Sequence, residues 1–324
     1  MAKTPRLTIV VTGRNDDYGG DFARRFIRAQ TFNLEQLHRH AMPVELILVE
    51  WNPVTDRPLL ADLLLEQLPA SLSELTRGFV VDGRYQHALS LNPELQYLEF
   101  IAKNVGLRRA TGRLVLATNT DIFFSRALVE RLVSDTVHDE RVYRANRIDL
   151  KLGIDESTIH HDLLENPANH VPRAPIVSPL YAGAAGDFIL LDRHTMTRLR
   201  GFNEVYRLAR IGVDHNFLVK AHSSGIPIED VGAPVYHVSH MTSFQVAKHL
   251  AGPNETQRLW GRRDWHNHHV IYDNPDGWGL NEAPVTQIGD RIWRLGFDWN
   301  AVAPLVDLDR IVLPGMSTDR AEPT

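Results

Sequence analysis

The 324-residue chain contains no cysteine. Disulfides, zinc–thiolate sites, cysteine-ligated iron–sulfur clusters and a cysteine nucleophile are therefore excluded. The chain also lacks an apolar run that approaches the length of a membrane span. The apolar stretch near the N-terminus, Leu7–Val11, is too short for a signal peptide and leads directly into charged residues. We therefore expect a cytoplasmic protein without a transmembrane segment.

An excess of positive charge is missing as well. Lysine and arginine total 35, aspartate and glutamate total 40, and the formal net charge is −5. This balance gives no indication of nucleic-acid or membrane-surface binding. Apolar residues make up 43% of the chain and charged residues 23%, which is ordinary for a folded globular protein and argues against disorder, collagen or coiled coil.

The first part of the chain alternates short β-branched runs with longer amphipathic patterns. Strands are predicted over Leu7–Thr12, Val44–Trp51, Phe79–Asp82 and Arg113–Thr118, and helices over Asp21–His40, Pro58–Leu68 and Pro93–Ala110. Such alternation predicts an α/β fold, with a Rossmann-like, mostly parallel central sheet flanked by helices.

The pattern changes after about residue 125. Strands are predicted over Arg141–Leu150, Asp187–Asp192 and Pro234–Val238, a helix over Val213–Ser224, and a loop over His160–Pro179. Five of the six tryptophans and a histidine cluster follow, at Trp260, Trp265, Trp278, Trp293, Trp299, His266, His268 and His269. We expect residues 241–314 to form a C-terminal appendage packed on the core, with surface histidines, and residues 315–324 to form a flexible tail.

Polar residues follow each of the first four predicted strands. They begin at Gly13, Glu50, Asp82 and Asn119. Because ligands of open α/β sheets bind outside the carboxyl ends of the strands, these residues predict a binding edge.

Neither common phosphate-binding loop is present: the chain has no G-x-G-x-x-G after the first strand and no G-x-x-x-x-G-K-[ST]. Acidic side chains at a phosphate site require a divalent cation between them and the phosphate. Asn119 and Asp121 are spaced to point the same way from an extended segment and could reach an ion held by phosphate. An Asx turn that closes the strand is the alternative explanation.

Two blocks of the sequence resemble GT-A fold glycosyltransferases, in particular family 2. The first block comprises Lys103-Asn104-Val105-Gly106, Ala110-Thr111-Gly112-Arg113 and Leu116-Ala117-Thr118-Asn119-Thr120-Asp121. It is similar to the helix and strand that lead into the family's Asp-x-Asp motif. The second block comprises Gly201-Phe202-Asn203-Glu204, Gly212-Val213-Asp214, Gly225 and Val235-Tyr236-His237. It is similar to the acceptor half of the family.

The resemblance implies a GT-A catalytic domain over residues 1–240 that binds a nucleotide sugar and an acceptor. The implied reaction moves a hexosyl group from a nucleoside-diphosphate donor to a hydroxyl group of a carbohydrate or small molecule, as in polysaccharide biosynthesis. It also implies inversion at the anomeric carbon and assistance by Mn²⁺ or Mg²⁺.

The resemblance also assigns roles to individual residues. It implies Asp121, from the first block, and His237, from the second, as metal ligands, with His240 in reserve, and Asp214 as the general base. Asp214 could instead cap a helix, and His237 could be a structural residue. Asp187 either holds an acceptor hydroxyl group or ends a turn, and it is the alternative base.

We assign six further residues to nucleotide binding: Asn15, Asp17, Glu50, Asp82, Asn104 and Asn119. The sequence departs from the family at two positions. Asn119 stands at the position of the first acid of Asp-x-Asp, so the expected metal site has one negative charge fewer. Val213 stands at the position of the first acid of Glu-Asp, which leaves Asp214 alone.

Two other functions remain open. Sugar nucleotidyltransferases share a similar early sheet, but they carry a basic, glycine-rich loop after the first strand. The corresponding stretch, Thr12–Gly20, is acidic and contains no lysine. A non-catalytic nucleotide- or carbohydrate-binding protein is the third possibility, because the two acids at positions 119 and 213 are missing.

Overall fold

The computed structural model describes residues 4–16, 18–208, 212–239 and 271–312. Its central sheet contains β1 (Leu7–Gly13), β2 (Val44–Trp51), β3 (Thr76–Val81), β4 (Leu114–Thr118), β6 (Val142–Arg144), β9 (Phe188–Asp192), β10 (Ile228–Asp230), β12 (Val285–Gly289) and β13 (Ile292–Leu295). The strand order is β10-β6-β9-β4-β1-β2-β3-β13-β12. Five of the eight pairings are parallel, and β9 and β12 supply the antiparallel ones. The predicted α/β class with a mostly parallel sheet is confirmed.

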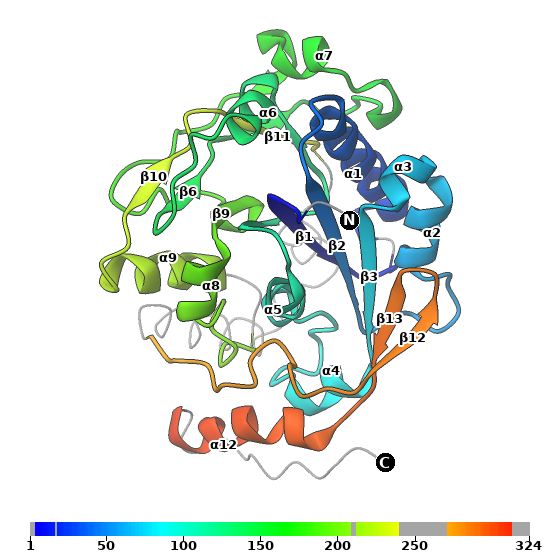
Figure 1. The fold of residues 1–324 in the computed structure, drawn as a ribbon, viewed down its shortest axis with the longest axis vertical. Coiled ribbons are helices and arrows are strands. Elements are labelled where there is room, and N and C mark those ends of the chain that lie inside the picture. The colour runs from blue at the N-terminus through cyan, green and yellow to red at the C-terminus, as the bar shows by residue number, and fades with distance from the viewer. Residues whose placement is uncertain (1–3, 17, 209–211, 240–270, 313–324) are drawn as a thin grey trace.

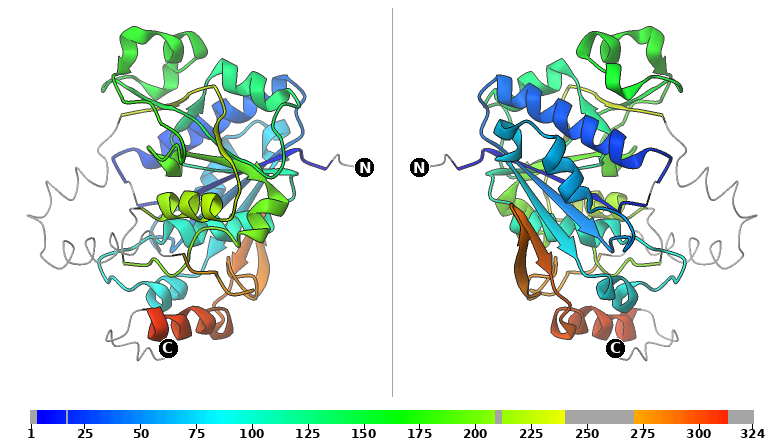
Figure 2. Two further views of the ribbon diagram at one scale, coloured as in Figure 1. Left: turned by 90° about the vertical axis from the view of Figure 1, so that its left-hand side faces the viewer. Right: turned by 90° about the vertical axis from the view of Figure 1, so that its right-hand side faces the viewer.

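Helices cover both faces of this sheet (Figure 1). They are α1 (Phe22–Arg39), α2 (Leu60–Gln67), α3 (Ala70–Ser73), α4 (Arg84–Leu89), α5 (Glu99–Arg109), α6 (Arg126–Val133), α7 (His161–Glu165), α8 (Arg193–Arg198), α9 (Val213–Ser223) and α12 (Ala303–Val312). Short 3₁₀ turns are η1 (Glu156–Thr158), η2 (Pro167–Asn169), η3 (Ala185–Asp187) and η4 (Trp299–Ala301). Figure 2 shows α7 and α12 at opposite ends of the molecule.

The alternation of side chains along the buried strands divides the core into two layers. In β1, Val10 packs in the layer that contains α5, whereas Ile9 and Val11 pack in the layer that contains α1 and α2. Successive side chains of a strand point to opposite faces, so a continuous apolar run is needed where both faces are covered. This explains why Leu7–Gly13 is buried along its whole length.

One glycine permits the close approach of α5 to the sheet. A Cβ atom on Gly106 would lie 2.5 Å from Cγ1 of Val10. Any larger residue would push the helix away from β1 and β2, so the Asn104-x-Gly106 pattern has a packing reason.

A second sheet lies beside the first and was not predicted. Its strands are β5 (Ile122–Phe124), β7 (Arg147–Leu150), β8 (His170–Val171) and β11 (Val235–His237), in the order β5-β11-β7-β8. A small apolar cluster, including Phe32 and Phe123, packs this sheet against α1 and α7.

Several predicted elements differ from those observed. Strand β3, expected over Phe79–Asp82, begins three residues earlier, at Thr76. The expected strand over Arg141–Leu150 is two strands, since β6 joins the central sheet and β7 joins the second. The helix expected from Pro93 begins at Glu99. The expected loop over His160–Pro179 contains α7, η2 and β8.

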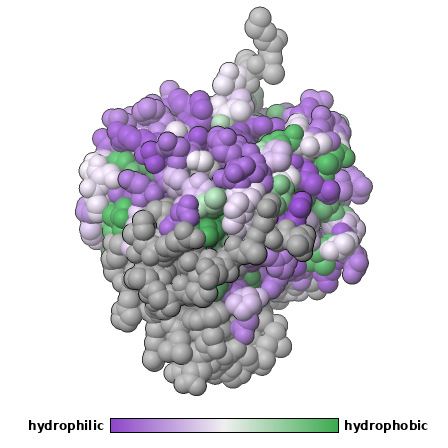
Figure 3. Space-filling view, turned by 90° about the horizontal axis from the view of Figure 1, so that it is seen from below, coloured by the Kyte–Doolittle hydropathy of each residue, from purple (hydrophilic) through white to green (hydrophobic). Residues whose placement is uncertain are grey.

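Residues after 271 continue the central sheet. Strand β13 pairs in parallel with β3, and β12 forms the outer edge. Trp278, Trp293 and Trp299 pack in or against the core layer of α5. Trp260, Trp265, His266, His268 and His269 lie outside the described residues, and the domain division at residue 240 stays a prediction. In Figure 3 the described part of the visible face is largely hydrophilic, with apolar residues in small separate patches. No described helix has the length and apolar character needed to span a membrane.

Candidate functional site

A cleft of about 350 Å³ opens at the carboxyl ends of β1 and β4. Its size falls within the range of small-molecule sites. Its walls come from seven separate segments of the chain. The lining residues are Thr12, Gly13, Arg14, Asp16, Tyr18, Phe22, Tyr97, Glu99, Phe100, Asn119, Thr120, Asp121, Arg147, Ala184, Gly186, Asp187, Gly212, Asp214 and His237.

Asn119 occupies the middle of the cleft floor and is held at both ends of its amide. Its Oδ1 accepts a hydrogen bond of 2.8 Å from Nζ of Lys103, and its Nδ2 donates one of 2.7 Å to Oδ1 of Asp187. The Lys103 ammonium is buried and also donates to Glu99 and to the carbonyl oxygen of Gly186. Both functional atoms of Asn119 are thus used within the protein, so this amide orients Asp187.

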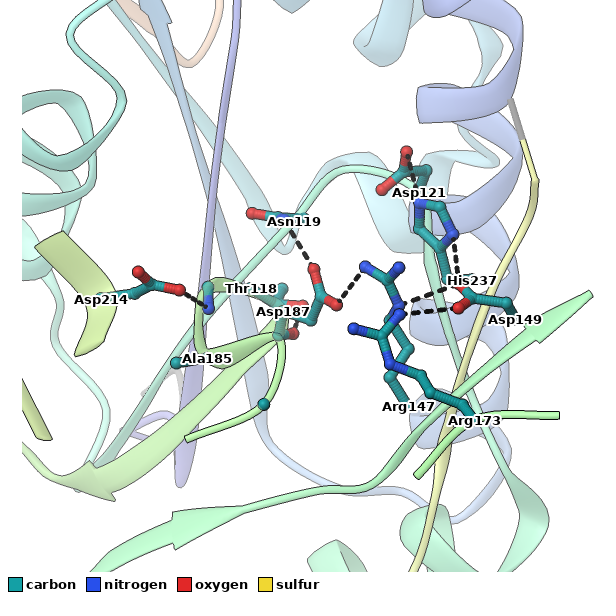
Figure 4. Close-up of polar contacts among 12 residues, drawn as sticks. Thr118, Asn119, Asp121, Arg147, Asp149, Arg173, Ala185, Asp187, Asp214 and His237 are labelled. Carbon is teal, nitrogen blue, oxygen red and sulfur yellow. Dashed lines mark hydrogen bonds and ion pairs between the residues drawn. The ribbon is translucent and has the colours of Figure 1, made fainter. Parts of the chain in front are cut away.

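Asp214 lies at one end of the cleft, in the first turn of α9. Its Oδ2 accepts a 2.7 Å hydrogen bond from the backbone N–H of Gly186 (Figure 4). Desolvation raises the pKa of Asp214 above its usual value, while hydrogen bonds from the backbone and the charge of Lys103 oppose this effect. A carboxylate that lines a cleft and has a raised pKa is a candidate proton acceptor.

Asp121 and His237 meet at the other end of the cleft, on the far side of Asp187 from Asp214 (Figure 4). Oδ2 of Asp121 lies 3.6 Å from Nε2 of His237, and Nδ1 of His237 lies 3.0 Å from Oδ1 of Asp149. Burial lowers the pKa of His237, but the charge of Asp121 and the hydrogen bonds to both carboxylates outweigh it and raise this pKa to about 9. The imidazole therefore lies between two carboxylates.

Arg147 joins the two ends of the cleft. Its NH1 lies 2.8 Å from Oδ2 of Asp187, and its Nε lies 2.9 Å from Oδ1 of Asp149. Burial raises the pKa of Asp149, but the hydrogen bonds from His237 and Arg173 and the charge of Arg147 hold it well below its usual range. Asp149 therefore stays ionised beside the imidazole.

Arg14 in the loop after β1 supplies a cation to the cleft wall, and Tyr97 supplies an aromatic ring. Nε of Arg14 donates a 2.6 Å hydrogen bond to the carbonyl oxygen of Asn52, and its NH1 lies 3.3 Å from Oδ2 of Asp16. Tyr97 approaches from the segment before α5, and its hydroxyl group bonds to that of Thr12. A guanidinium group and an aromatic ring that line the same cleft are groups suited to contact a nucleotide.

Two residues assigned to the nucleotide from the sequence point away from the cleft. The side-chain amide of Asn15 donates to the carbonyl oxygen of Pro58. Glu50 is fully buried, and its Oε2 accepts a hydrogen bond from the backbone N–H of Ala61 in the first turn of α2. Both residues connect the sheet edge to the segment that begins α2.

Two more assigned residues also serve the fold. Oδ1 of Asp82 accepts from the backbone and side chain of Arg84, next to α4. Asn104 is fully buried, and its Nδ2 donates to the carbonyl oxygen of Phe202 and to Oε1 of Glu204, both at 2.8 Å. The Asn104 side chain thus ties α5 to the Gly201–Glu204 loop and leaves no contact for a ligand in the cleft.

The structure therefore brings together Asn119, Asp121, Asp187, Asp214 and His237 and leaves out the four residues just described. Asp17 and His240 lie outside the described residues.

Sequence reasoning missed several cleft residues. Arg14 and Asp16 were visible only as neighbours of Asn15, in a loop whose side-chain directions a sequence does not reveal. Arg147 and Asp149 did carry a signal, because residues two apart in a strand point to the same face.

Among the described residues, no three histidine, aspartate or glutamate side chains converge to hold a metal ion. Asp121 and His237 alone fit a hard cation of the kind that takes one or two protein ligands and completes its shell with phosphate oxygens and water. The Nδ1 contact to Asp149 supports that fit, since histidine ligands usually donate this N–H to a carboxylate or carbonyl oxygen.

No protein-family model matches the chain, and no curated protein matches it significantly. Solved structures similar to it include the catalytic domain of Drosophila β1,4-galactosyltransferase 7 in complex with xylobiose. That similarity has 12% identity and a TM-score of 0.44, and it covers 93% of this chain and 98% of that one.

Two further similar structures are S. aureus TarS 1–349 with UDP-GlcNAc and GalNAc-T7 with UDP, GalNAc and Mn²⁺. TarS has 12% identity, a TM-score of 0.47, and coverage of 85% of this chain and 69% of that one. GalNAc-T7 has 10% identity, a TM-score of 0.42, and coverage of 82% and 51%. Identities of 10–12% say nothing of what this chain binds.

Proposed function

We propose that this chain is a GT-A-type glycosyltransferase that moves a sugar from a nucleoside-diphosphate donor to a hydroxyl group. The observation that carries the proposal is the division of the cleft into two acidic ends. Asp214 lies at one end and the Asp121–His237 pair at the other, with Asn119 and Asp187 between them. Sugar transfer needs such a division, because the proton leaves the acceptor on one side of the anomeric carbon and the diphosphate leaves on the other.

The donor would lie along the loop after β1. Arg14 and Arg147 place two guanidinium groups on the wall of the cleft, where they can neutralise a diphosphate. The ring of Tyr97 can stack on the nucleobase, and Asp16 can accept hydrogen bonds from ribose hydroxyl groups. A glycine-rich phosphate loop is not needed in this arrangement.

Asp121 and His237 would hold a divalent cation, either Mn²⁺ or Mg²⁺. When bound, such an ion supplies positive charge that stabilises the departing diphosphate. Asn119 does not take part as a ligand in our proposal, because Lys103 and Asp187 already occupy its amide. Asparagine at the first position of Asp-x-Asp therefore holds Asp187 in place and does not act as a metal ligand.

Asp214 is the proposed general base. Its carboxylate takes the proton of the acceptor hydroxyl group, the acceptor oxygen forms a bond to the anomeric carbon, and the bond from that carbon to the diphosphate oxygen breaks. Attack from the side opposite the leaving group inverts the anomeric centre. The N–H of Gly186 holds one oxygen of Asp214 in place.

Asp187 is a weaker candidate for the base, because both of its oxygens are engaged. Oδ1 accepts from Asn119 and Oδ2 is paired with Arg147. We assign Asp187 to positioning the acceptor or the transferred sugar, and we keep Asp214 for the proton.

A thermal-shift screen of nucleoside diphosphates, with and without Mn²⁺, tests the proposal, since a ligand that binds the folded state raises the melting temperature. A glycosyltransferase is stabilised by one nucleoside diphosphate and releases it from the matching nucleotide sugar. A sugar nucleotidyltransferase would instead release pyrophosphate from a nucleoside triphosphate and a sugar 1-phosphate. A binding protein would be stabilised without turnover. Stabilisation by none of the nucleotides would contradict the proposal.

A further inference from the structure

The register of the second sheet places a carboxylate directly behind the histidine of the cleft. Strands β7 and β11 are parallel neighbours, and Asp149 is the register partner of His237. The contact of 3.0 Å between Oδ1 of Asp149 and Nδ1 of His237 thus follows from the strand pairing. His237 is buried, so this contact is shielded from solvent.

Asp149 is itself held in place by two arginines. Arg147 contacts Oδ1 at 2.9 Å, on the side of the cleft, and Arg173 contacts Oδ2 at 2.7 Å, on the outer side. The carboxylate cannot rotate away from the imidazole without breaking both ion pairs. A fixed acceptor at Nδ1 keeps the proton on that nitrogen and leaves Nε2 as the atom that faces Asp121.

We propose that Asp149 is a positioning residue for the cation site: it fixes the orientation of the His237 ring and directs Nε2 toward the ion. This inference rests on the proposed function, because it requires that Asp121 and His237 hold a cation. Outer carboxylates of this kind typically change metal affinity by about 10- to 100-fold when they are removed.

The chain offers a matched control. Arg173 contacts the outer oxygen of Asp149 and is partly exposed, and it is not among the residues that line the cleft. Arg173→Gln removes one ion pair of Asp149 but leaves its contacts to Arg147 and His237. Arg173→Gln, which changes only the charge around Asp149, can therefore be compared with variants that alter the Asp149 carboxylate itself.

The experiment measures the dissociation constant of Mn²⁺ by electron paramagnetic resonance, in the presence of UDP, GDP, ADP or CDP. We expect about 10- to 100-fold weaker Mn²⁺ binding for Asp149→Ala than for the parent. Asp149→Asn should lie between the two, since the amide oxygen can still accept from Nδ1. Arg173→Gln should stay within about twofold of the parent, and nucleotide binding without metal should not change.

Two outcomes would overturn the inference, and they differ from each other. If the parent binds Mn²⁺ with none of the four nucleotides, the cation site of the proposed function is wrong, and the role of Asp149 falls with it. If the parent binds Mn²⁺ and Asp149→Ala binds it equally well, only the role of Asp149 is wrong. Should Asp149→Ala fail to fold, the comparison of Asp149→Asn with Arg173→Gln decides: weaker binding in the first variant alone supports the inference, and equal binding overturns it.

Discussion

The variant Glu50→Gln tests whether Glu50 is a buried structural carboxylate or a residue that contacts the nucleotide. Desolvation raises the pKa of Glu50 from 4.5 to about 7, although hydrogen bonds from the backbone of Leu60 and Ala61 oppose the rise. The Oε1 atom is buried and has no hydrogen-bond partner among the residues that the structure describes. Ionisation of Glu50 therefore weakens the folded state, and glutamine imitates the neutral form.

The size of the effect follows from linkage. The folded state holds the proton of Glu50 more tightly than the unfolded state does. The stabilisation of the folded state by protonated Glu50 is therefore fully present below pH 4.5 and is lost as the pH rises through 7. The interval between these values corresponds to about 3 kcal/mol as an upper limit, since one pKa unit is worth about 1.4 kcal/mol. With an unfolding entropy of about 2.1 cal/mol/K per residue, this is about 4 °C in Tm for a chain of 324 residues.

Differential scanning fluorimetry between pH 4.5 and pH 8 measures the prediction. The Tm of Glu50→Gln minus that of the parent should rise by up to about 4 °C across this range. Glu66→Gln, an exposed change on α2, is the control for loss of one charge and should show no such trend. A difference that does not depend on pH would refute the reasoning, and a tenfold loss of nucleotide affinity would show that Glu50 contacts the ligand.

Asp121→Ala should lose at least tenfold in Mn²⁺ affinity and nearly all transfer, and near-normal turnover would mean that Asp121 is no ligand. Asn119→Asp should lower the affinity for Mn²⁺, because the new carboxylate cannot donate a hydrogen bond to Asp187 and repels the Asp187 carboxylate beside it. The sequence alone favours tighter metal binding by this variant, and tighter Mn²⁺ binding in calorimetry would contradict our prediction. Asn104→Ala should lower the free energy of unfolding by about 3 kcal/mol in urea titrations, because Glu204 and the N–H of Phe202 lose a buried partner, and nucleotide affinity should not change.

The hydrophobic pattern predicted β1 and β2 well because both strands are rich in apolar and β-branched residues. Val44–Trp51 matches β2 in full, and Leu7–Thr12 falls one residue short of β1. The division of Arg141–Leu150 between two sheets could not be predicted, since neither glycine nor proline interrupts the run. Only the tertiary pairing of β6 with β9 and of β7 with β11 separates the two strands.

The direction of polar side chains at the strand ends was the hardest feature to predict. Glu50 and Asn119 both follow or end buried strands, yet Glu50 turns toward α2 and Asn119 toward the cleft. Strand position alone does not distinguish them, because the first residues beyond a strand can also begin the next helix. Asp214 and His237 were placed by resemblance, since their segments are far from β1 in the chain.

The release of nucleoside diphosphate by Asp214→Asn tests the central claim most directly. The assay uses the nucleotide sugar whose diphosphate stabilises the parent most, and it compares initial rates and nucleotide affinities of the two proteins. Asparagine can accept the Gly186 hydrogen bond but cannot take the acceptor's proton, so we predict a Tm no lower than the parent's, equal nucleotide affinity and a rate about 100- to 10,000-fold lower. Release at the parent's rate by Asp214→Asn would contradict the assignment of the base and, with it, the proposed division of the cleft.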